Sequence, residues 1–236
     1  ENTFGADASN DIVFPKGKAP DFMGSFILKN GGISVEILPD VEVLHGGKLV
    51  GDIAMKSDAE GKPTILSHGT LSWYIIKRSN DFAVRLRDSA NPNIESFHGI
   101  ERYPVDPDWR IEATFERYDP QRSISVPTIL GTVVEEPSPG ALVFKIQGET
   151  YRLDVIGELD DERFFVIFGD ETNKDETYES GRYVYVDNPG SGGETIIDFN
   201  KAYNPPCAFT DYATCQFPPE QNILPVEIKA GEKRYH

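Results

Sequence analysis

The sequence predicts an all-β fold, an N-terminal β-sandwich packed on a C-terminal antiparallel sheet or barrel. Apolar and polar residues alternate with a period of two, for example over residues 82–87 and 109–116. This alternation is typical of half-buried strands, because successive side chains of a strand point to opposite faces of the sheet. Turn signals such as Asn30-Gly31 recur roughly every eight to twelve residues. With 21 Gly and 17 Pro in 236 residues, the chain leaves little room for a long helix.

The alternating runs divide the chain into two parts. The first part has short runs that we expect to form strands at residues 12–14, 25–28, 34–37, 42–44, 64–66, 72–76 and 83–87. Residues 88–107 contain three prolines and almost no alternation, which is typical of a connector. The second part has longer runs, ending at 225–229. We therefore predict two domains, residues 1–90 and residues 91–236.

The charge of the chain argues against some partners. The sequence has 39 Asp and Glu against 23 Lys and Arg, a formal net charge of −16. Such a surface repels phosphate backbones, so we expect no nucleic-acid partner. No apolar run reaches the length of a membrane-spanning segment, so we expect none. The first residues, ENTFGAD, show no signal peptide and no initial methionine, which is compatible with removal of an upstream segment. The compartment, extracytoplasmic or cytoplasmic, stays open.

The densest group of polar residues follows a strand-like run near the end of the chain. The segment from Thr195 to Cys215 reads TIIDFNKAYNPPCAFTDYATC. Its Asp198, Asn200 and Asn204 offer a carboxylate and two amides, which could bind a sugar or another polar ligand through paired hydrogen bonds. The alternative is structural, because Asp and Asn often cap turns and hold loop backbone.

A second stretch, residues 169–186, could complete such a site. Arg182 begins a strand and could hold a carboxylate or phosphate bidentately, or could pair inside the protein with Asp170 or Asp198. We expect Tyr178 and Phe209 to form aromatic walls and Tyr212 to contact the ligand.

The two cysteines, Cys207 and Cys215, allow three interpretations. A disulfide between them would close a short loop and stabilise by roughly 2 to 3 kcal/mol. They could also be buried thiols, or thiols that pack on opposite faces. Cys207 follows a rigid Pro-Pro step and could be a nucleophile, but no histidine lies near it in sequence to act as a base.

No cofactor or metal motif is visible in the sequence. The four histidines, His45, His68, His98 and His236, show no metal-binding spacing. The acidic residues between 170 and 179 lack the spaced ligands of a calcium loop. There is no Gly-x-Ser-x-Gly elbow and no glycine-rich phosphate loop before a helix. We expect no metal and no cofactor.

Two resemblances add to this interpretation. The segments FGADASNDIVFP and HGTLSWYIIKRSNDFAVRLRD resemble the forkhead-associated domain in outline, although Ala6 stands at the position of its phosphate-binding arginine. This implies a sandwich without phosphothreonine binding. The segments RYPVDPDWRIEATFERYD, PTILGTVVEEPSPGALVF, ETYESGRYVYVD and IIDFNKAYNPPCAFTDYATCQFPPEQNILPVEIKAGEK look like domain of unknown function 1684, an uncharacterised bacterial and archaeal family. This resemblance implies relatives that are often exported or lipid-anchored, with no established activity.

The favoured hypothesis is a binding protein for a small polar molecule, such as a carbohydrate. Its site would contain Arg182, Asp198, Asn200, Asn204 and Tyr212. One alternative is a hydrolase that uses the same pocket, with Asp198 as base or Cys207 as nucleophile. Another is a protein-interaction module, in which the N-terminal sandwich contacts a protein partner.

Overall fold

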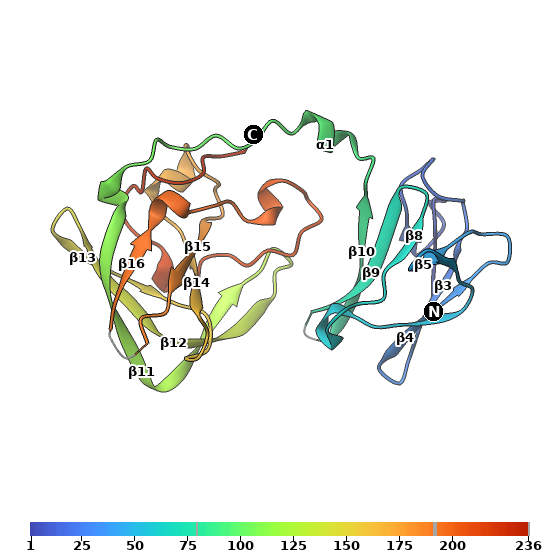
Figure 1. The fold of residues 1–236 in the computed structure, drawn as a ribbon, viewed down its shortest axis with the longest axis horizontal. Coiled ribbons are helices and arrows are strands. Elements are labelled where there is room, and N and C mark those ends of the chain that lie inside the picture. Colours follow the sequence, from blue (N-terminus) through green and yellow to red (C-terminus); the bar gives the residue numbers. More distant parts are fainter. Residues whose placement is uncertain (79, 191–192, 236) are drawn as a thin grey trace. The chain divides into compact units, whose positions relative to one another are not determined.

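The chain folds into two compact units, Glu1–His98 and Gly99–His236. The computed structural model describes residues 1–78, 80–190 and 193–235, and it consists almost entirely of strands and loops (Figure 1). The prediction of an all-β protein is therefore confirmed. Among the described residues, no helix is long and apolar enough to cross a membrane. His236, one of the four histidines of the sequence, lies outside the described part of the chain.

The N-terminal unit is a sandwich of two five-stranded sheets. The first sheet, in the order β2-β1-β3-β4-β7, contains β1 (Asn2–Gly5), β2 (Ile12–Val13), β3 (Gly24–Lys29), β4 (Gly32–Ile37) and β7 (Ile53–Met55). The second, in the order β10-β9-β8-β5-β6, contains β5 (Leu44–His45), β6 (Lys48–Leu49), β8 (Leu66–His68), β9 (Leu71–Arg78) and β10 (Asp81–Asp88). Both sheets bury apolar side chains in one core, where the Trp73 ring lies 5.2 Å from that of Phe14 and 6.0 Å from that of Phe4.

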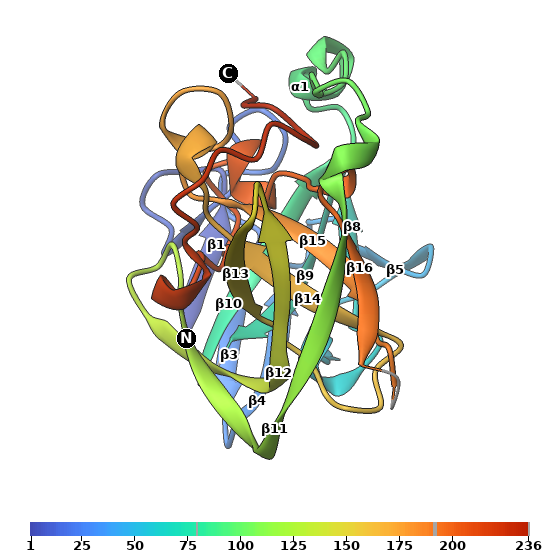
Figure 2. The same cartoon turned by 90° about the vertical axis from the view of Figure 1, so that its left-hand side faces the viewer.

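The C-terminal unit is built on two long strands that pair with each other. The four-stranded sheet, in the order β13-β12-β11-β16, contains β11 (Arg110–Pro127), β12 (Val133–Ile146), β13 (Glu149–Asp154) and β16 (Glu194–Asp198). A two-stranded sheet consists of β14 (Arg163–Phe168) and β15 (Arg182–Asp187). Figure 2 shows β13, β12, β11 and β16 side by side. Neighbouring strands are antiparallel in both sheets.

The core of this unit lies between the two sheets. Ala113 and Phe115 of β11 are buried while Glu112 and Thr114 are exposed, as the alternation predicts. Phe115 packs against Phe164 of the other sheet, with the ring centroids 4.9 Å apart. Burial of large aromatic side chains from both sheets therefore holds the sheets together.

The helices are all short, and most of them belong to connecting segments. They are η1 (Asp58–Glu60), α1 (Pro92–Ser96), η2 (Pro107–Trp109), η3 (Glu171–Lys174), η4 (Phe199–Lys201), η5 (Pro206–Ala208) and η6 (Glu220–Asn222).

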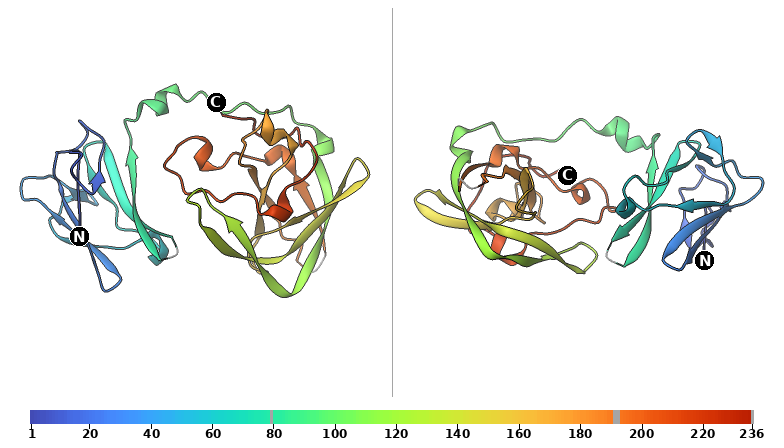
Figure 3. Two further views of the ribbon diagram at one scale, coloured as in Figure 1. Left: turned by 180° about the vertical axis from the view of Figure 1, so that it is seen from behind. Right: turned by 60° about the horizontal axis from the view of Figure 1, so that its bottom comes forward.

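After β16 the chain runs without regular strands to its described end (Figure 3). Asn222 ties this C-terminal segment to both sheets: its Nδ2 donates to the carbonyls of Asp154 and Ile167, each at 2.9 Å, and its Oδ1 accepts from Asp154 N at 2.8 Å. Residues 225–229 were predicted to form a strand but are irregular. Their backbone groups bond to the η3 region, for example Glu171 N to Val226 O at 3.0 Å, instead of to a sheet.

Candidate functional site

A polar hollow of about 410 Å³ lies where β15 and β16 run beside each other. We call it the seam hollow. It combines three basic side chains, two carboxylates and two tyrosines, and its lining consists of Arg110, Arg163, Tyr185, Asp187, Thr195, Ile196, Asp198, Lys201 and Tyr203. The Thr195 hydroxyl donates to the Asp187 carbonyl at 2.8 Å, which links the edges of the two sheets.

Strand register explains why the charged side chains meet there. Arg110 of β11 is the cross-strand partner of Asp198 in β16. Arg163 of β14 is the cross-strand partner of Asp187 in β15. Directly opposite residues on antiparallel strands project their side chains on the same face. Each sheet therefore contributes one arginine and one aspartate to the same hollow.

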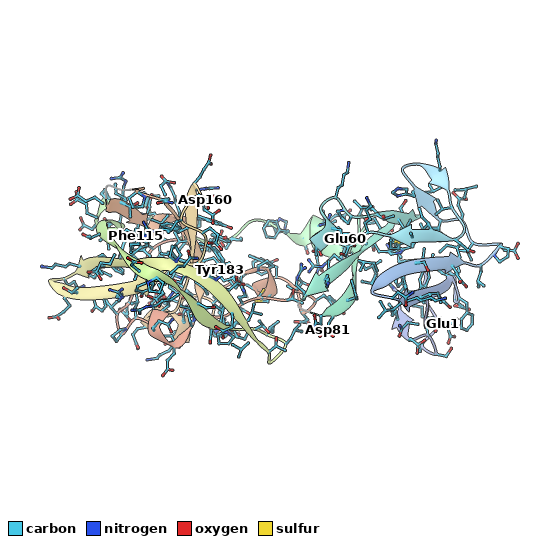
Figure 4. The ribbon with its side chains drawn as sticks, turned by 90° about the horizontal axis from the view of Figure 1, so that it is seen from below. Glu1, Glu60, Asp81, Phe115, Asp160 and Tyr183 are labelled. Atoms are coloured by element: carbon cyan, nitrogen blue, oxygen red, sulfur yellow. The ribbon has the colours of Figure 1, made fainter. Side chains whose placement is uncertain are left out.

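Tyr185 and Tyr203 form the aromatic wall of the hollow. Their rings are stacked with centroids 6.4 Å apart, and the Arg163 guanidinium lies 5.1 Å from the Tyr185 ring centroid. The backbone of Tyr203 is fixed by two hydrogen bonds of 2.9 Å to the backbone of Tyr183. Tyr183 is labelled in Figure 4, among the side chains of the C-terminal unit. Tyr185 is 47% exposed, so part of this wall is accessible to a ligand. Burial raises the pKa of Tyr203 to about 12, which keeps its hydroxyl protonated near neutral pH.

Asp198 lies at the end of β16, where the chain turns into η4. Its Oδ1 accepts from Asn200 N at 3.2 Å and from Asn200 Nδ2 at 3.1 Å, and its Oδ2 lies 3.5 Å from Lys201 Nζ. The side chain is half-buried and lines the seam hollow. Asp198 therefore caps the turn, which is the structural alternative, and its side chain also lines the hollow.

Asn200 and Asn204 hold backbone segments. Asn200 exchanges hydrogen bonds with the backbone of Asp106, at 3.0 Å and 2.8 Å. Asn204 is buried; its backbone N donates to Glu232 Oε2 at 2.7 Å and its Nδ2 to the Lys233 carbonyl at 2.8 Å. Neither asparagine lines the seam hollow.

Arg182 is fully buried and pairs with Asp170. Both side chains are 0% exposed, and Arg182 Nη2 lies 2.7 Å from Asp170 Oδ2. The guanidinium also donates to the carbonyls of Ile228, at 2.9 Å, and Ala230. Asp170 Oδ1 accepts from Thr172 N at 2.9 Å. The arrangement matches the internal pair that the sequence allowed as one alternative, and it connects β15, η3 and the C-terminal segment.

The remaining predicted residues lie in the irregular segment or beside it. Cys207 and Cys215 are free thiols, and Cys207 N donates to Cys215 Sγ at 2.9 Å. Burial raises the pKa of the Cys215 thiol to about 12, and burial together with a hydrogen bond to Cys207 raises the pKa of Tyr178. The Phe209 ring lies 4.9 Å from the Tyr235 ring, and Tyr212 is 90% exposed.

Of the predicted site residues, Asp198 alone is among the described lining of the seam hollow. Sequence reasoning missed the arginines and tyrosines that surround it. The alternation of RYVYVD places Tyr183, Tyr185 and Asp187 on one face of their strand. That signal could have nominated Tyr185, but the sequence does not show that β15 lies beside β16.

The described residues contain no group of three or more His, Cys, Asp or Glu side chains that could hold a metal ion. Two of the histidines bond to backbone instead: His45 Nδ1 lies 2.9 Å from the Ile65 carbonyl, and His68 Nδ1 lies 2.6 Å from the Glu42 carbonyl.

The fold and this site define an all-β protein whose C-terminal unit carries a charged, tyrosine-walled hollow between two antiparallel sheets. Residues 95–233 match the family described as protein of unknown function (DUF1684), and the chain belongs to that family. It is also similar to the solution NMR structure of an uncharacterised protein of Haloarcula marismortui. The two are 32% identical with a TM-score of 0.50, over 61% of this chain and 80% of that one. None of the curated proteins matches the chain.

Proposed function

We propose that the protein binds a small polyhydroxylated ligand, a carbohydrate, in the seam hollow. The observation that carries the proposal is the combination there of Asp198 with the exposed ring of Tyr185. A sugar ring presents an apolar C–H face and a rim of hydroxyl groups. The first packs on an aromatic face, and the second bonds to a few converging polar groups, which is the usual composition of small-molecule sites.

The charged residues of the hollow can accept hydrogen bonds from ligand hydroxyls and can donate hydrogen bonds to ligand oxygens. Asp198 and Asp187 accept hydrogen bonds from ligand hydroxyls, while Lys201 and the arginines donate to ligand oxygens. Asp198 is held by Asn200 and Lys201, so its carboxylate is oriented before a ligand arrives. A preoriented group loses less entropy on binding.

The other predicted residues support this site indirectly. Asn200 orients Asp198, and Arg182 and Asn204 hold the C-terminal segment to the unit. Tyr178, Phe209 and Tyr212 belong to the irregular segment around the two thiols, and the proposal gives them no contact with the ligand.

A thermal-shift screen of monosaccharides and oligosaccharides tests the proposal. A sugar that binds the folded state raises the melting temperature, by linkage. We expect Asp198→Asn to abolish the shift with the fold unchanged, because the amide keeps the Oδ1 acceptor that caps η4 but loses the charge. Asp160→Asn, at an exposed aspartate outside the hollow, is the matched control. A shift of equal size in Asp198→Asn and wild type refutes this site.

A hydrolase in the same unit has less support. Burial raises the pKa of the Cys215 thiol, and the neighbouring Cys207 has no histidine among its described hydrogen-bond partners. A thiol without a neighbouring base is a poor nucleophile. The exposed hollow contains two aspartates, Asp187 and Asp198, but the Asp198 carboxylate already holds Asn200 and Lys201.

For the N-terminal unit we propose a forkhead-associated-like scaffold without phosphate binding. Ala6 is buried in a turn whose backbone bonds internally, Ala6 N to Pro20 O at 2.8 Å and Asp7 N to Asp21 O at 3.1 Å. The residues bonded at this turn include the acidic Asp7 and Asp21, and no arginine stands at position 6, which does not favour a bound phosphate. A protein partner of this sandwich stays a proposal, and an extracytoplasmic, lipid-anchored location is a proposal that depends on the family resemblance.

A further inference from the structure

Arg110 of β11 and Arg163 of β14 line the seam hollow, one from each sheet. Among the described residues, neither side chain takes part in an ion pair or a hydrogen bond, although their cross-strand partners are the aspartates Asp198 and Asp187. The Arg163 guanidinium lies 5.1 Å from the centroid of the Tyr185 ring. The Arg182 guanidinium, by contrast, forms an ion pair with Asp170 and donates hydrogen bonds to backbone carbonyls. The bidentate donor faces of Arg110 and Arg163 are thus available to a ligand.

The hollow has the opposite charge balance to the chain that carries it. The chain has 39 acidic and 23 basic residues. The lining of the hollow has three basic side chains, Arg110, Arg163 and Lys201, against two carboxylates, Asp187 and Asp198. Lys201 lies 3.5 Å from Asp198 and partly neutralises it. A local excess of positive charge in an acidic protein favours an anionic ligand at that place.

We infer that the ligand of the seam hollow is an acidic sugar, whose anionic group is bound by Arg110 and Arg163. This inference rests on the proposed carbohydrate function. Arginine presents planar, paired N–H groups that match the two oxygens of a carboxylate or phosphate. The aspartates then accept from the ring hydroxyls, and the sugar ring packs on Tyr185. The shared chemistry is an oxyanion attached to a sugar ring, whether the carboxylate of a uronic acid or a phosphate ester.

Neutral and anionic sugars with the same ring distinguish the acidic-sugar inference from the carbohydrate proposal on which it rests. Galacturonate and galactose share the ring and its hydroxyl arrangement, and galactose 1-phosphate supplies the other oxyanion. Titration calorimetry on the full chain measures the dissociation constant of each. We expect the better of the two anionic sugars to bind at least about tenfold more tightly than galactose, which corresponds to about 1.4 kcal/mol. Which anion binds more tightly identifies carboxylate or phosphate as the group recognised.

The variant Arg163→Gln removes the charge and keeps a polar side chain of similar length. We expect it to remove the preference for the acidic sugar, so that the affinities for the acidic sugar and for galactose become equal within about twofold. Arg117→Gln is the matched control, because Arg117 is an exposed arginine of β11 outside the hollow. We expect the control to bind all three sugars as wild type does. Added salt should weaken binding of the acidic sugar and leave that of galactose unchanged, because salt screens charge interactions at exposed sites.

Each failure has its own signature. If galactose binds as tightly as both anionic sugars and Arg163→Gln changes none of the three, the acidic-sugar inference is wrong and the carbohydrate proposal stands. If none of the three sugars binds the wild-type protein and the wider sugar screen gives no shift, both are wrong.

Discussion

At the residue scale, Arg182 shows how one side chain can join distant parts of a fold. It begins β15, and its guanidinium bonds to Asp170 before η3 and to carbonyls at Ile228 and Ala230. A charge buried in this way is tolerated because its partners replace the water it has lost. The pair is therefore a structural feature of the interior, while the exposed arginines of the seam hollow are available to a ligand.

We predict that Arg182→Ala destabilises the C-terminal unit by about 3 to 5 kcal/mol, because it leaves the Asp170 carboxylate buried without its partner. Chemical denaturation followed by Trp109 fluorescence, in a Trp73→Phe background, measures the change in the free energy of unfolding of that unit. Arg163→Ala, at an exposed arginine without an ion pair among the described residues, is the control and should change it by no more than about 0.5 kcal/mol. Equal stability of the two variants would contradict the prediction.

Sequence reasoning at this scale could recognise residue types but not their exposure. Asp198 was found because a carboxylate at the end of a strand run is visible in the sequence, and it does line the hollow. Arg182 and Arg163 both begin strands, yet one is fully buried and the other exposed. The difference depends on the C-terminal segment covering Arg182, and the sequence does not reveal that contact.

At the element scale, the close pairing of β11 and β12 positions the rest of the C-terminal unit. Gly140 of β12 is the cross-strand partner of Arg117 and packs directly on the neighbouring strand. A Cβ atom at Gly140 would overlap the Glu116 carbonyl oxygen and lie 2.6 Å from Cε2 of Phe115. The absence of a side chain at Gly140 therefore allows Phe115 to reach Phe164 in the core.

We predict that Gly140→Ala lowers the free energy of unfolding by about 1 to 3 kcal/mol, the usual cost of overpacking. The same denaturation experiment measures it. Gly51→Ala adds a Cβ that meets nothing within 4 Å and is the control; because Gly51 belongs to the N-terminal unit, its effect is followed by Trp73 fluorescence in a Trp109→Phe background. We expect the control to stay within about 0.5 kcal/mol of wild type. A Gly140→Ala protein as stable as wild type would contradict the prediction, because the two strands would then accommodate a methyl group without loss of stability.

The alternation of the strands was predictable because it is a local pattern, and residues 109–116 illustrate this. The choice of partner strand was not predictable in this way. β16 pairs with the beginning of β11, although the two strands are far apart in the sequence. This pairing brings Asp198 opposite Arg110. Residues 225–229 have a strand-like sequence but find their backbone partners in the η3 region. Tertiary contacts decide such cases, because apolar alternation alone does not specify a partner strand.

At the scale of the whole molecule, each unit has a core of its own, and the residues between the two cores are exposed. Trp73 and its neighbours fill the N-terminal unit, while Phe115 and Phe164 belong to the C-terminal one. Residues 90–99, which include α1, are all exposed. The predicted boundary between residues 90 and 91 stays a prediction, and proteolysis can test it.

We predict that a glutamate-specific protease cuts the native chain first after Glu95, because exposed segments with few tertiary contacts are the preferred sites of cleavage. Mass spectrometry of a brief digest identifies the first two fragments, and circular dichroism shows whether each keeps its β signal. Glu95→Gln should suppress this cut and leave slower ones. First cleavage inside β11 or β12 would contradict the division into two units.

The contacts of Arg182 also bear on the order in which the chain is completed during synthesis. The N-terminal unit has all the strands of its sandwich once Asp88 has been made. The C-terminal unit lacks the acceptors of its buried guanidinium until Ile228 and Ala230 emerge from the ribosome. We therefore expect the nascent chain to carry a complete first unit and an incomplete second one from the synthesis of Asp88 until that of Ala230, and chaperone binding would protect the chain most in this interval.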